Sequence, residues 1–202
     1  MSSRKLSQSN RRQRHRSLKS RRRLSIESLE HRRLLATINW DGGPSGLGSL
    51  WSDPENWVGD TVPGAVDDVI IGAEFASATI EITTPTTVNS ISSHAPLNLF
   101  DGSLTVQSLA LQSTLTTNTS SELIIGGGQV AGLGSIVNEG SITAHATSFL
   151  VGIENRGTLK TFNNVSITGA LTTTPSSVIT IPANDSVVAN GLYVTENFTN
   201  HG

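Results

Sequence analysis

The stretch IVNEGSIT at residues 136–143 recurs as IENRGTLK at residues 153–160, an offset of 17 residues. Both copies follow the pattern I-x-N-x-G-[ST]-[IL]-[TK], and a third Asn-x-Gly triplet begins at Asn200. A repeated unit of this length is typical of a solenoid, in which stacked coils share one continuous core. Asn and Gly tolerate positive φ, so we expect these triplets to turn the chain at the corners of the coils.

Short apolar runs continue this pattern on both sides of the two copies. Several alternate apolar with polar residues, as at residues 79–82 and 104–106, which is the period of a half-buried strand. None has the length or spacing of a helix. We therefore predict an all-β protein, a right-handed parallel β-helix or related β-solenoid, with about six coils of about 20 residues each between residues 80 and 202. An antiparallel β-sandwich is the structural alternative.

The repeat region breaks off at residues 200–202, where both earlier Asn-x-Gly triplets lead directly into a predicted strand. Terminal repeats usually differ from internal ones, because they have to cover the core. We therefore expect residues 73–202 to form solenoid repeats that are truncated, either as a shortened gene product or as the start of a longer protein.

Charge divides the chain into two parts. Residues 1–35 contain 12 of the 14 Lys and Arg residues, against Glu27 and Glu30 alone. The remaining residues contain 14 acidic residues against Arg156 and Lys160, together with all 19 Gly, all 7 Pro and all 3 Trp. A strongly basic segment has too little apolar surface to form a core, so we predict that residues 1–36 form a disordered leader or a short helix.

Three roles fit such a leader. It could neutralise phosphates as a nucleic-acid or nuclear-targeting arm, it could be the positive region of an export signal, or it could be a solvated tail. A general export signal requires roughly 7–15 apolar residues next. Between Leu24 and Ala36 the apolar residues are interrupted by Glu27, Glu30 and residues 31–33, so the general rule fits poorly.

The segment IESLEHRRLLA at residues 26–36 resembles the LEPR-x-LL motif, which lies near the N-terminus of large exported repeat proteins of planctomycete-type bacteria. His31 stands where that family has Pro, and the loss of a fixed φ leaves the local conformation free to differ. The resemblance implies sorting to the cell envelope or the outside through export machinery, and it implies no reaction. The matching residues are Leu29, Glu30, Arg32, Leu34 and Leu35.

The segment at residues 37–72 contains Trp40, Trp51 and Trp57 among turn-forming residues. Large aromatic side chains can plug the open core of a first coil, and Pro and acidic residues discourage further strand pairing. We therefore predict a Trp-containing N-terminal cap, and the pattern resembles the entry module of adhesin-like bacterial β-solenoids. A sugar-binding platform is the alternative use of the three indoles. The acidic residues lack EF-hand spacing, so a solvated surface is favoured over a Ca²⁺ site.

No catalytic, cofactor or metal site is predicted. The Gly-rich stretch at residues 126–134 lacks the Lys and spacing of a phosphate loop, so we predict a turn. The absence of Cys excludes disulfides and thiolate chemistry. Glu154, Arg156 and Lys160 are close in sequence, and alternation would place Glu154 and Arg156 on one face of a strand. No partner for them is evident, and isolated His residues such as His145 are predicted to lie on the surface.

These features predict a secreted or cell-surface structural or adhesin-like repeat protein without catalytic activity. The partners would be extracellular glycans or other surface proteins, with no nucleic acid and no transmembrane segment. The alternative is a carbohydrate-binding or carbohydrate-degrading β-helix, since polysaccharide-cleaving enzymes also use this fold. A nucleic-acid arm is a third hypothesis, and it predicts DNA binding by the leader that weakens steeply with salt.

Overall fold

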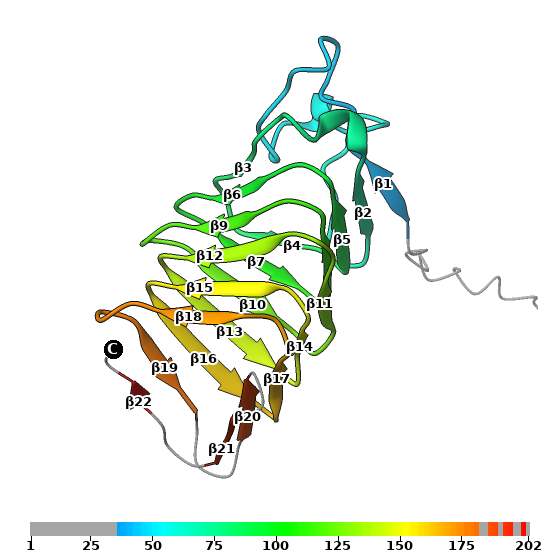
Figure 1. Ribbon diagram of the computed structural model, residues 1–202. Coiled ribbons are helices and arrows are strands. Elements are labelled where there is room, and N and C mark those ends of the chain that lie inside the picture. Colours follow the sequence, from blue (N-terminus) through cyan, green and yellow to red (C-terminus); the bar gives the residue numbers. More distant parts are fainter. Residues whose placement is uncertain (1–35, 182–185, 190–191, 196–198, 201–202) are drawn as a thin grey trace, which may run out of the picture. The chain divides into compact units, whose positions relative to one another are not determined.

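A computed structural model of the protein describes residues 36–181, 186–189, 192–195 and 199–200 (Figure 1). Within these ranges the chain forms 22 strands and two single-turn 3-10 helices, η1 (Pro54–Asn56) and η2 (Ala73–Phe75). The predicted all-β class is therefore confirmed. The predicted sorting motif lies outside the described residues and stays a prediction; its residues are Leu29, Glu30, Arg32, Leu34 and Leu35.

Three sheets run along the molecule, and each coil of the chain contributes one strand to each sheet (Figure 1). The nine-stranded sheet has the order β1 (Thr37–Asn39), β2 (Asp68–Ile71), β5 (Ser90–Ser93), β8 (Ser108–Leu111), β11 (Gln129–Ala131), β14 (Ser148–Phe149), β17 (Val165–Ile167), β20 (Ser186–Ala189) and β21 (Leu192–Thr195). The seven-stranded sheet has the order β22 (Thr199–Asn200), β19 (Val178–Thr180), β16 (Thr158–Phe162), β13 (Ser141–His145), β10 (Glu122–Ile125), β7 (Ser103–Val106) and β4 (Thr86–Thr87). The six-stranded sheet has the order β18 (Leu171–Thr173), β15 (Gly152–Asn155), β12 (Ser135–Asn138), β9 (Leu115–Thr117), β6 (Leu97–Leu99) and β3 (Ile80–Ile82).

The strands from β3 to β20 make about six coils, as the apolar runs predicted. In the six-stranded sheet Ile80 stacks on Leu97, Leu97 on Leu115, Leu115 on Ile136 and Ile136 on Ile153, all in parallel register. Along this sheet the length of a coil lies between 17 residues, from Ile80 to Leu97, and 21 residues, from Leu115 to Ile136. Because neighbouring coils pair in parallel, the antiparallel sandwich is excluded and the β-solenoid is confirmed.

The core is a set of apolar columns that run across the coils. Along most strands whose side chains are described, buried residues alternate with partly or fully exposed ones, for example in β10 and β13. In the seven-stranded sheet, one such column consists of Leu104, Leu123, Ile142 and Leu159, which stack in register and are each 0% exposed. Burial of one such side chain stabilises the fold by about 1.5–3 kcal/mol, so the stacking of like residues is the main source of stability.

The two copies of the repeat, at residues 136–143 and 153–160, stack directly on one another. Residues 135–138 pair with residues 152–155 in the six-stranded sheet, and residues 141–145 pair with residues 158–162 in the seven-stranded sheet. The third Asn-x-Gly triplet does not continue this stack. Thr199 and Asn200 form β22, which runs antiparallel to β19, whereas a further coil would require a parallel strand.

The segment at residues 37–72, here called the Trp segment, joins two of the three sheets. Its strand β1 pairs in parallel with β2, which pairs in parallel with β5 of the first coil. Beside β3, the Glu81 backbone N–H donates to Ser49 O at 2.7 Å and the Trp51 N–H donates to Glu81 O at 2.9 Å. These bonds extend the six-stranded sheet past its first strand, so the Trp segment covers an edge that would otherwise have unpaired backbone groups.

Candidate functional site

The three Trp residues of the predicted cap form one buried cluster. Trp40, Trp51 and Trp57 are 2%, 1% and 0% exposed. The rings of Trp40 and Trp57 meet edge to face with centroids 4.8 Å apart, and those of Trp51 and Trp57 with centroids 4.7 Å apart. The indole N–H of Trp57 donates to the carbonyl oxygen of Trp51 at 2.7 Å. These contacts fix the positions of the three indoles, and of the chain around them, relative to one another.

The burial of the Trp cluster bears directly on the predicted sugar platform. An indole stacks on a pyranose ring only through an accessible face, and all three side chains are covered by protein. Asn56, which is also buried, donates from Nδ2 to Leu50 O at 2.9 Å and occupies the space beside Gly48. The geometry of the Trp segment therefore favours a packing role for these indoles over a binding role.

The asparagines of the repeat point into the solenoid, where they form a polar ladder. Asn138 and Asn155 are both 0% exposed. Thr117 Oγ1 donates to Asn138 Oδ1 at 2.6 Å, and Asn138 Nδ2 donates to Asn155 Oδ1 at 2.7 Å. Asn138 Nδ2 also lies 3.0 Å from Thr158 O, and Asn155 Nδ2 lies 3.4 Å from Val178 O. The ladder satisfies buried polar groups at the corner between the six- and seven-stranded sheets.

The predicted reason for the Asn-x-Gly pattern is wrong. Positive φ occurs elsewhere in the described chain, but not at Asn138, Asn155 or the glycines that follow them. Glycine is required because the backbones of stacked coils approach closely here. A Cβ at Gly157 would lie 2.1 Å from Gly140 O, and a Cβ at Gly140 would lie 2.1 Å from Asn118 O in the preceding coil.

The Gly-rich stretch that could have suggested a phosphate loop forms two corners, as predicted. Residues 126–128 connect β10 to β11, and residues 132–134 connect β11 to β12. Gly127 and Gly132 have φ values of 118° and 117°, which an L-residue adopts only with strain. Gly127 and Gly132 therefore allow the backbone to turn at these two corners.

Glu154 and Arg156, which are close in sequence, form an exposed ion-paired cluster with Glu139. Arg156 Nε donates to Glu154 Oε1 at 2.9 Å, and Arg156 Nη1 donates to Glu139 Oε1 at 2.9 Å. The hydrogen bond and charge of Glu154, and then the hydrogen bond of Glu139, raise the pKa of Arg156 above its ordinary value. Sequence alone missed Glu139, because that residue reaches Arg156 only through the stacking of one coil on the next.

A carboxylate also links the Trp segment to the first coil. Asp68 of β2 accepts hydrogen bonds from Ser90 Oγ at 2.5 Å and from Asn89 Nδ2 at 2.8 Å. These two bonds lower the pKa of Asp68, with the Ser90 bond the larger cause. In the part of the chain that the structure describes, no group of three or more His, Asp or Glu side chains is arranged to hold a metal ion.

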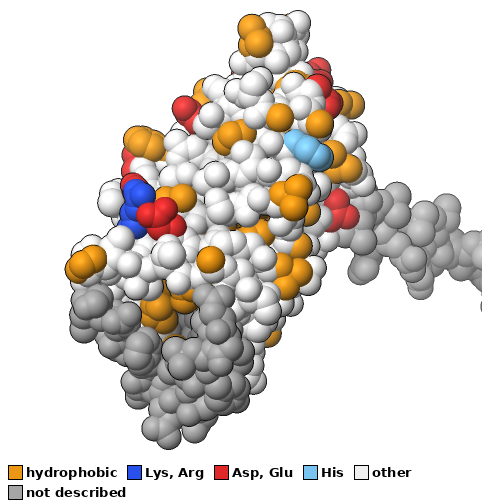
Figure 2. Space-filling model, in the orientation of Figure 1, with side chains coloured by type: hydrophobic (Ala, Val, Ile, Leu, Met, Phe, Trp, Pro, Cys, Tyr) orange, Lys and Arg blue, Asp and Glu red, His pale blue; other side chains and the backbone are white. Residues whose placement is uncertain are grey.

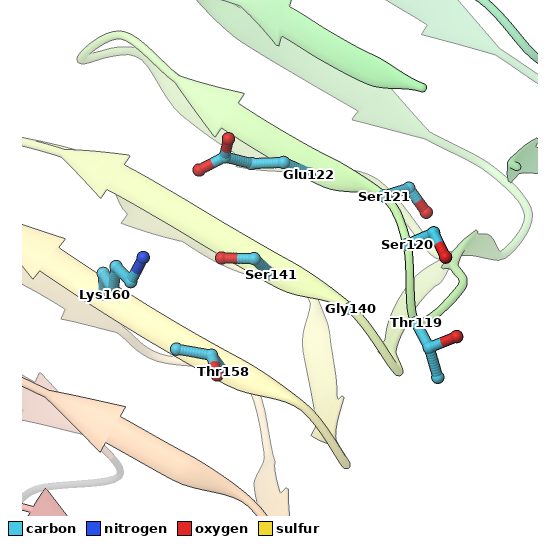
Figure 3. Close-up of a pocket in the computed structure, with 8 residues that line it drawn as sticks. All are labelled: Thr119, Ser120, Ser121, Glu122, Gly140, Ser141, Thr158 and Lys160. Atoms are coloured by element: carbon cyan, nitrogen blue, oxygen red, sulfur yellow. The ribbon is translucent and has the colours of Figure 1, made fainter. Parts of the chain in front are cut away.

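A shallow polar groove lies on the seven-stranded sheet, next to the corner formed by residues 118–121. That corner has four residues, whereas the corners of the next two coils, at residues 139–140 and 156–157, have two each. The longer corner stands beside the shorter ones, and the groove between them has a volume of about 390 Å³ (Figure 3). Its lining residues are Thr119, Ser120, Ser121, Glu122, Gly140, Ser141, Thr158 and Lys160.

The groove lining combines hydroxyl groups with one carboxylate and one ammonium group. Glu122 Oε1 accepts a hydrogen bond from Thr143 Oγ1 at 2.9 Å. Lys160 makes no ion pair with any residue that the structure describes. Ser141 Oγ is buried and has no hydrogen-bond partner among those residues. The groove therefore offers both donors and acceptors that the chain leaves unused.

An aromatic pair lies on the same two strands as the groove. His145 of β13 and Phe162 of β16 are partly exposed, and their rings stack with centroids 4.9 Å apart and an angle of 14° between the planes. Neither the groove nor this pair was identified from the sequence. The two additional residues in the corner at 118–121, relative to the next two corners, indicate the groove. They can be recognised only when the stacking register of the coils is known.

Outside the ion-paired cluster, charged side chains are sparse on the described surface. Figure 2 shows a face that is mostly uncharged, with basic and acidic side chains side by side in one small patch and further acidic side chains at separate places. No helix among the described residues has the length and hydrophobicity needed to cross a membrane.

The fold defines the protein as a parallel β-solenoid repeat protein. Comparison of the chain with family models, curated proteins and solved structures found no match. The function must therefore be argued from the chain's own residues.

Proposed function

We propose that the protein is a secreted or cell-surface structural or adhesin-like β-solenoid without catalytic activity. The observation that carries this proposal is the regular stack of about six coils, closed on one side by the buried Trp cluster. Such a stack forms a stiff support whose outer faces repeat along its length. It suits a protein that bridges or displays rather than one that encloses a substrate.

The state of the charged groups supports a role without catalysis. Hydrolysis of a polysaccharide by the usual mechanism requires two carboxylates set around the scissile bond, and the lining of the polar groove contains one carboxylate, that of Glu122. Glu139 and Glu154 both accept hydrogen bonds from Arg156 on an exposed surface. Their carboxylates neutralise one guanidinium and do not face each other across a cleft.

The contrast between the leader and the remaining chain supports export. Twelve of the 14 Lys and Arg residues lie in residues 1–35, and the LEPR-x-LL-like motif forms the end of this segment. The rest of the chain is acidic and would repel nucleic acid. In this proposal the leader directs the protein to the envelope or the outside, and the acidic solenoid acts there.

Cell fractionation followed by N-terminal sequencing of the recovered protein tests this proposal. We expect recovery outside the cytoplasm, with the leader removed near Ala36. A cytoplasmic protein that retains its full basic leader would contradict the proposal, and binding of that leader to DNA would then become the first function to measure.

Carbohydrate binding is a second candidate, and one specific observation favours it. The polar groove and the His145–Phe162 pair lie on the same outer face of the seven-stranded sheet. Hydroxyl-rich grooves with a nearby ring surface have the chemistry that sugars require, and the buried Trp cluster has no part in it.

A further inference from the structure

We propose that the outer face of β13 and β16, entered at the polar groove, binds an uncharged polysaccharide. This inference deepens the proposed surface role, on which it rests for its biological setting, by naming the class of partner and the residues that contact it. The binding itself is a property of the folded chain and can be measured separately from the location of the protein.

The hydrogen-bonding groups of the groove match those of a sugar. Each sugar hydroxyl donates and accepts, and a groove that binds it needs both kinds of partner within reach. Glu122 supplies an acceptor, Lys160 supplies a donor, and the hydroxyls of Ser141 and Thr158 supply both (Figure 3). Charged partners make the stronger hydrogen bonds, so we expect Glu122 and Lys160 to contribute most of the affinity.

The floor of the groove contains a polar atom that the fold leaves unsatisfied. Ser141 Oγ is buried without a hydrogen-bond partner among the described residues. An unpaired buried hydroxyl is a cost that the free protein carries. Ser141 itself is partly exposed, so a rotation of its side chain toward the groove would let a ligand hydroxyl bond to Oγ and remove that cost. Because it has no hydrogen-bond partner in the described part of the chain, this atom is bonded to neither Glu122 nor Lys160.

The aromatic pair extends this surface along the strands. On β13 the outward residues after Ser141 are Thr143 and His145, and on β16 the outward residues after Thr158 are Lys160 and Phe162. The four-residue step from Ser141 to His145 spans about 13 Å, and Lys160 at the edge of the groove lies two residues before Phe162. A chain of several sugar units lying along β13 and β16 would pass the polar residues and reach an aromatic surface.

The net negative charge of residues 36–202 favours an uncharged polysaccharide over a polyanion as the ligand. Residues 36–202 contain 14 acidic residues against Arg156 and Lys160, and Arg156 is already paired with two glutamates. A uronate-rich glycan or a nucleic acid would meet net repulsion from this part of the chain.

The sheet geometry disfavours a peptide as the occupant. The strands β10, β13 and β16 are each paired on both sides, so their backbones offer no free edge for strand addition. The groove lining contains no large apolar side chain to anchor a hydrophobic residue of a partner.

Affinity electrophoresis of the full chain tests the proposal. Native gels would contain laminarin, galactomannan, xyloglucan or dextran, which are uncharged and so have no electrostatic attraction to the basic leader. We expect at least one of them to retard the protein. The double variant Glu122→Gln/Lys160→Met keeps the net charge of the chain and removes both charged groups, so we expect its affinity to fall at least about tenfold.

The ion-paired cluster provides a matched control. Glu154→Gln/Arg156→Met likewise removes one acidic and one basic group, outside the groove and with the same net charge, and we expect it to bind like the wild type. The single variant Ser141→Ala removes an atom that has no partner in the fold, so it should fold normally and bind several-fold more weakly.

The outcomes separate the two proposals. Absence of retardation in all four gels overturns the binding site, as does unchanged binding by both groove variants or an equal loss in the control. Should the groove double variant lose its circular dichroism spectrum, Ser141→Ala alone decides the question. A cytoplasmic location would overturn the surface role and leave the binding result as it stands.

Discussion

The Trp segment and the repeat coils both exclude water from one core, but they do so by different means. The Trp segment uses three large side chains that meet edge to face within irregular chain. The coils use mainly Leu, Ile and Val side chains in columns, with each residue supported by its equivalent in the neighbouring coils. In the Trp segment, each indole packs against residues that have no equivalents elsewhere in the chain. In the coils, each buried side chain packs against the residues at the same position in the neighbouring coils.

This difference determines where a mutation is expected to be costly. In the Trp segment, no equivalent residue can take over the place of a lost indole, and its loss leaves a cavity between the two indoles that remain. In the coils, a lost side chain leaves neighbours on both sides in register, so the damage stays local unless it disturbs the backbone or the polar ladder.

The largest effect is expected for Trp57→Ala. Trp57 contacts both other indoles and is 0% exposed, so its loss should destabilise the fold by about 3–5 kcal/mol. Urea unfolding followed by circular dichroism measures the change. Leu47→Ala is the control in the same segment, because Leu47 is 84% exposed and should change stability by less than about 0.5 kcal/mol. Equal effects of the two variants would refute the central role of the cluster.

A smaller loss is expected for Asn138→Ala in the polar ladder. The change leaves Thr117 Oγ1 and Asn155 Oδ1 without their partner at the buried corner, which should cost about 2–3 kcal/mol. The same urea titration measures it. Thr116→Ala, on the outer face of the neighbouring strand, is the control and should be close to neutral. A neutral Asn138→Ala would mean that the ladder adds nothing to the apolar columns.

A third test compares two glycines of the same coil. Gly157→Ala places a Cβ 2.1 Å from Gly140 O, so stacked backbones must separate, and we expect a loss of about 1–2 kcal/mol. At Gly152 the nearest atom to a Cβ would be 3.7 Å away, so Gly152→Ala should be neutral or slightly stabilising. Thermal unfolding of both variants gives the order, and the reverse order would show that the close approach at Gly157 is unimportant.

The sequence predicted the coils better than it predicted the surfaces on them. Alternation of apolar and polar residues and the offset between the two repeat copies were enough for the fold class, the coil length and the number of coils. The inward direction of Asn138 was missed, although its spacing of two residues from the apolar Ile136 was a usable signal for it. The pairing of Glu139 with Arg156 and the polar groove were not predictable, because both exist only between coils.

The smallest effect is expected at the junction of the two regions, where Asp68 accepts hydrogen bonds from Ser90 and Asn89. These bonds lower the pKa of Asp68 in the folded protein. The carboxylate therefore stabilises the fold at pH values above its ordinary pKa, and this stability is lost as the pH falls through the lowered value. Asp68→Asn should reduce stability at neutral pH and leave the difference from the wild type smaller in acid. Urea titrations at neutral and strongly acidic pH measure that difference, with Asp53→Asn as a control, because Asp53 caps only the exposed turn η1. A difference that does not shrink in acid would show that the bonds to the carboxylate do not connect the Trp segment to the first coil.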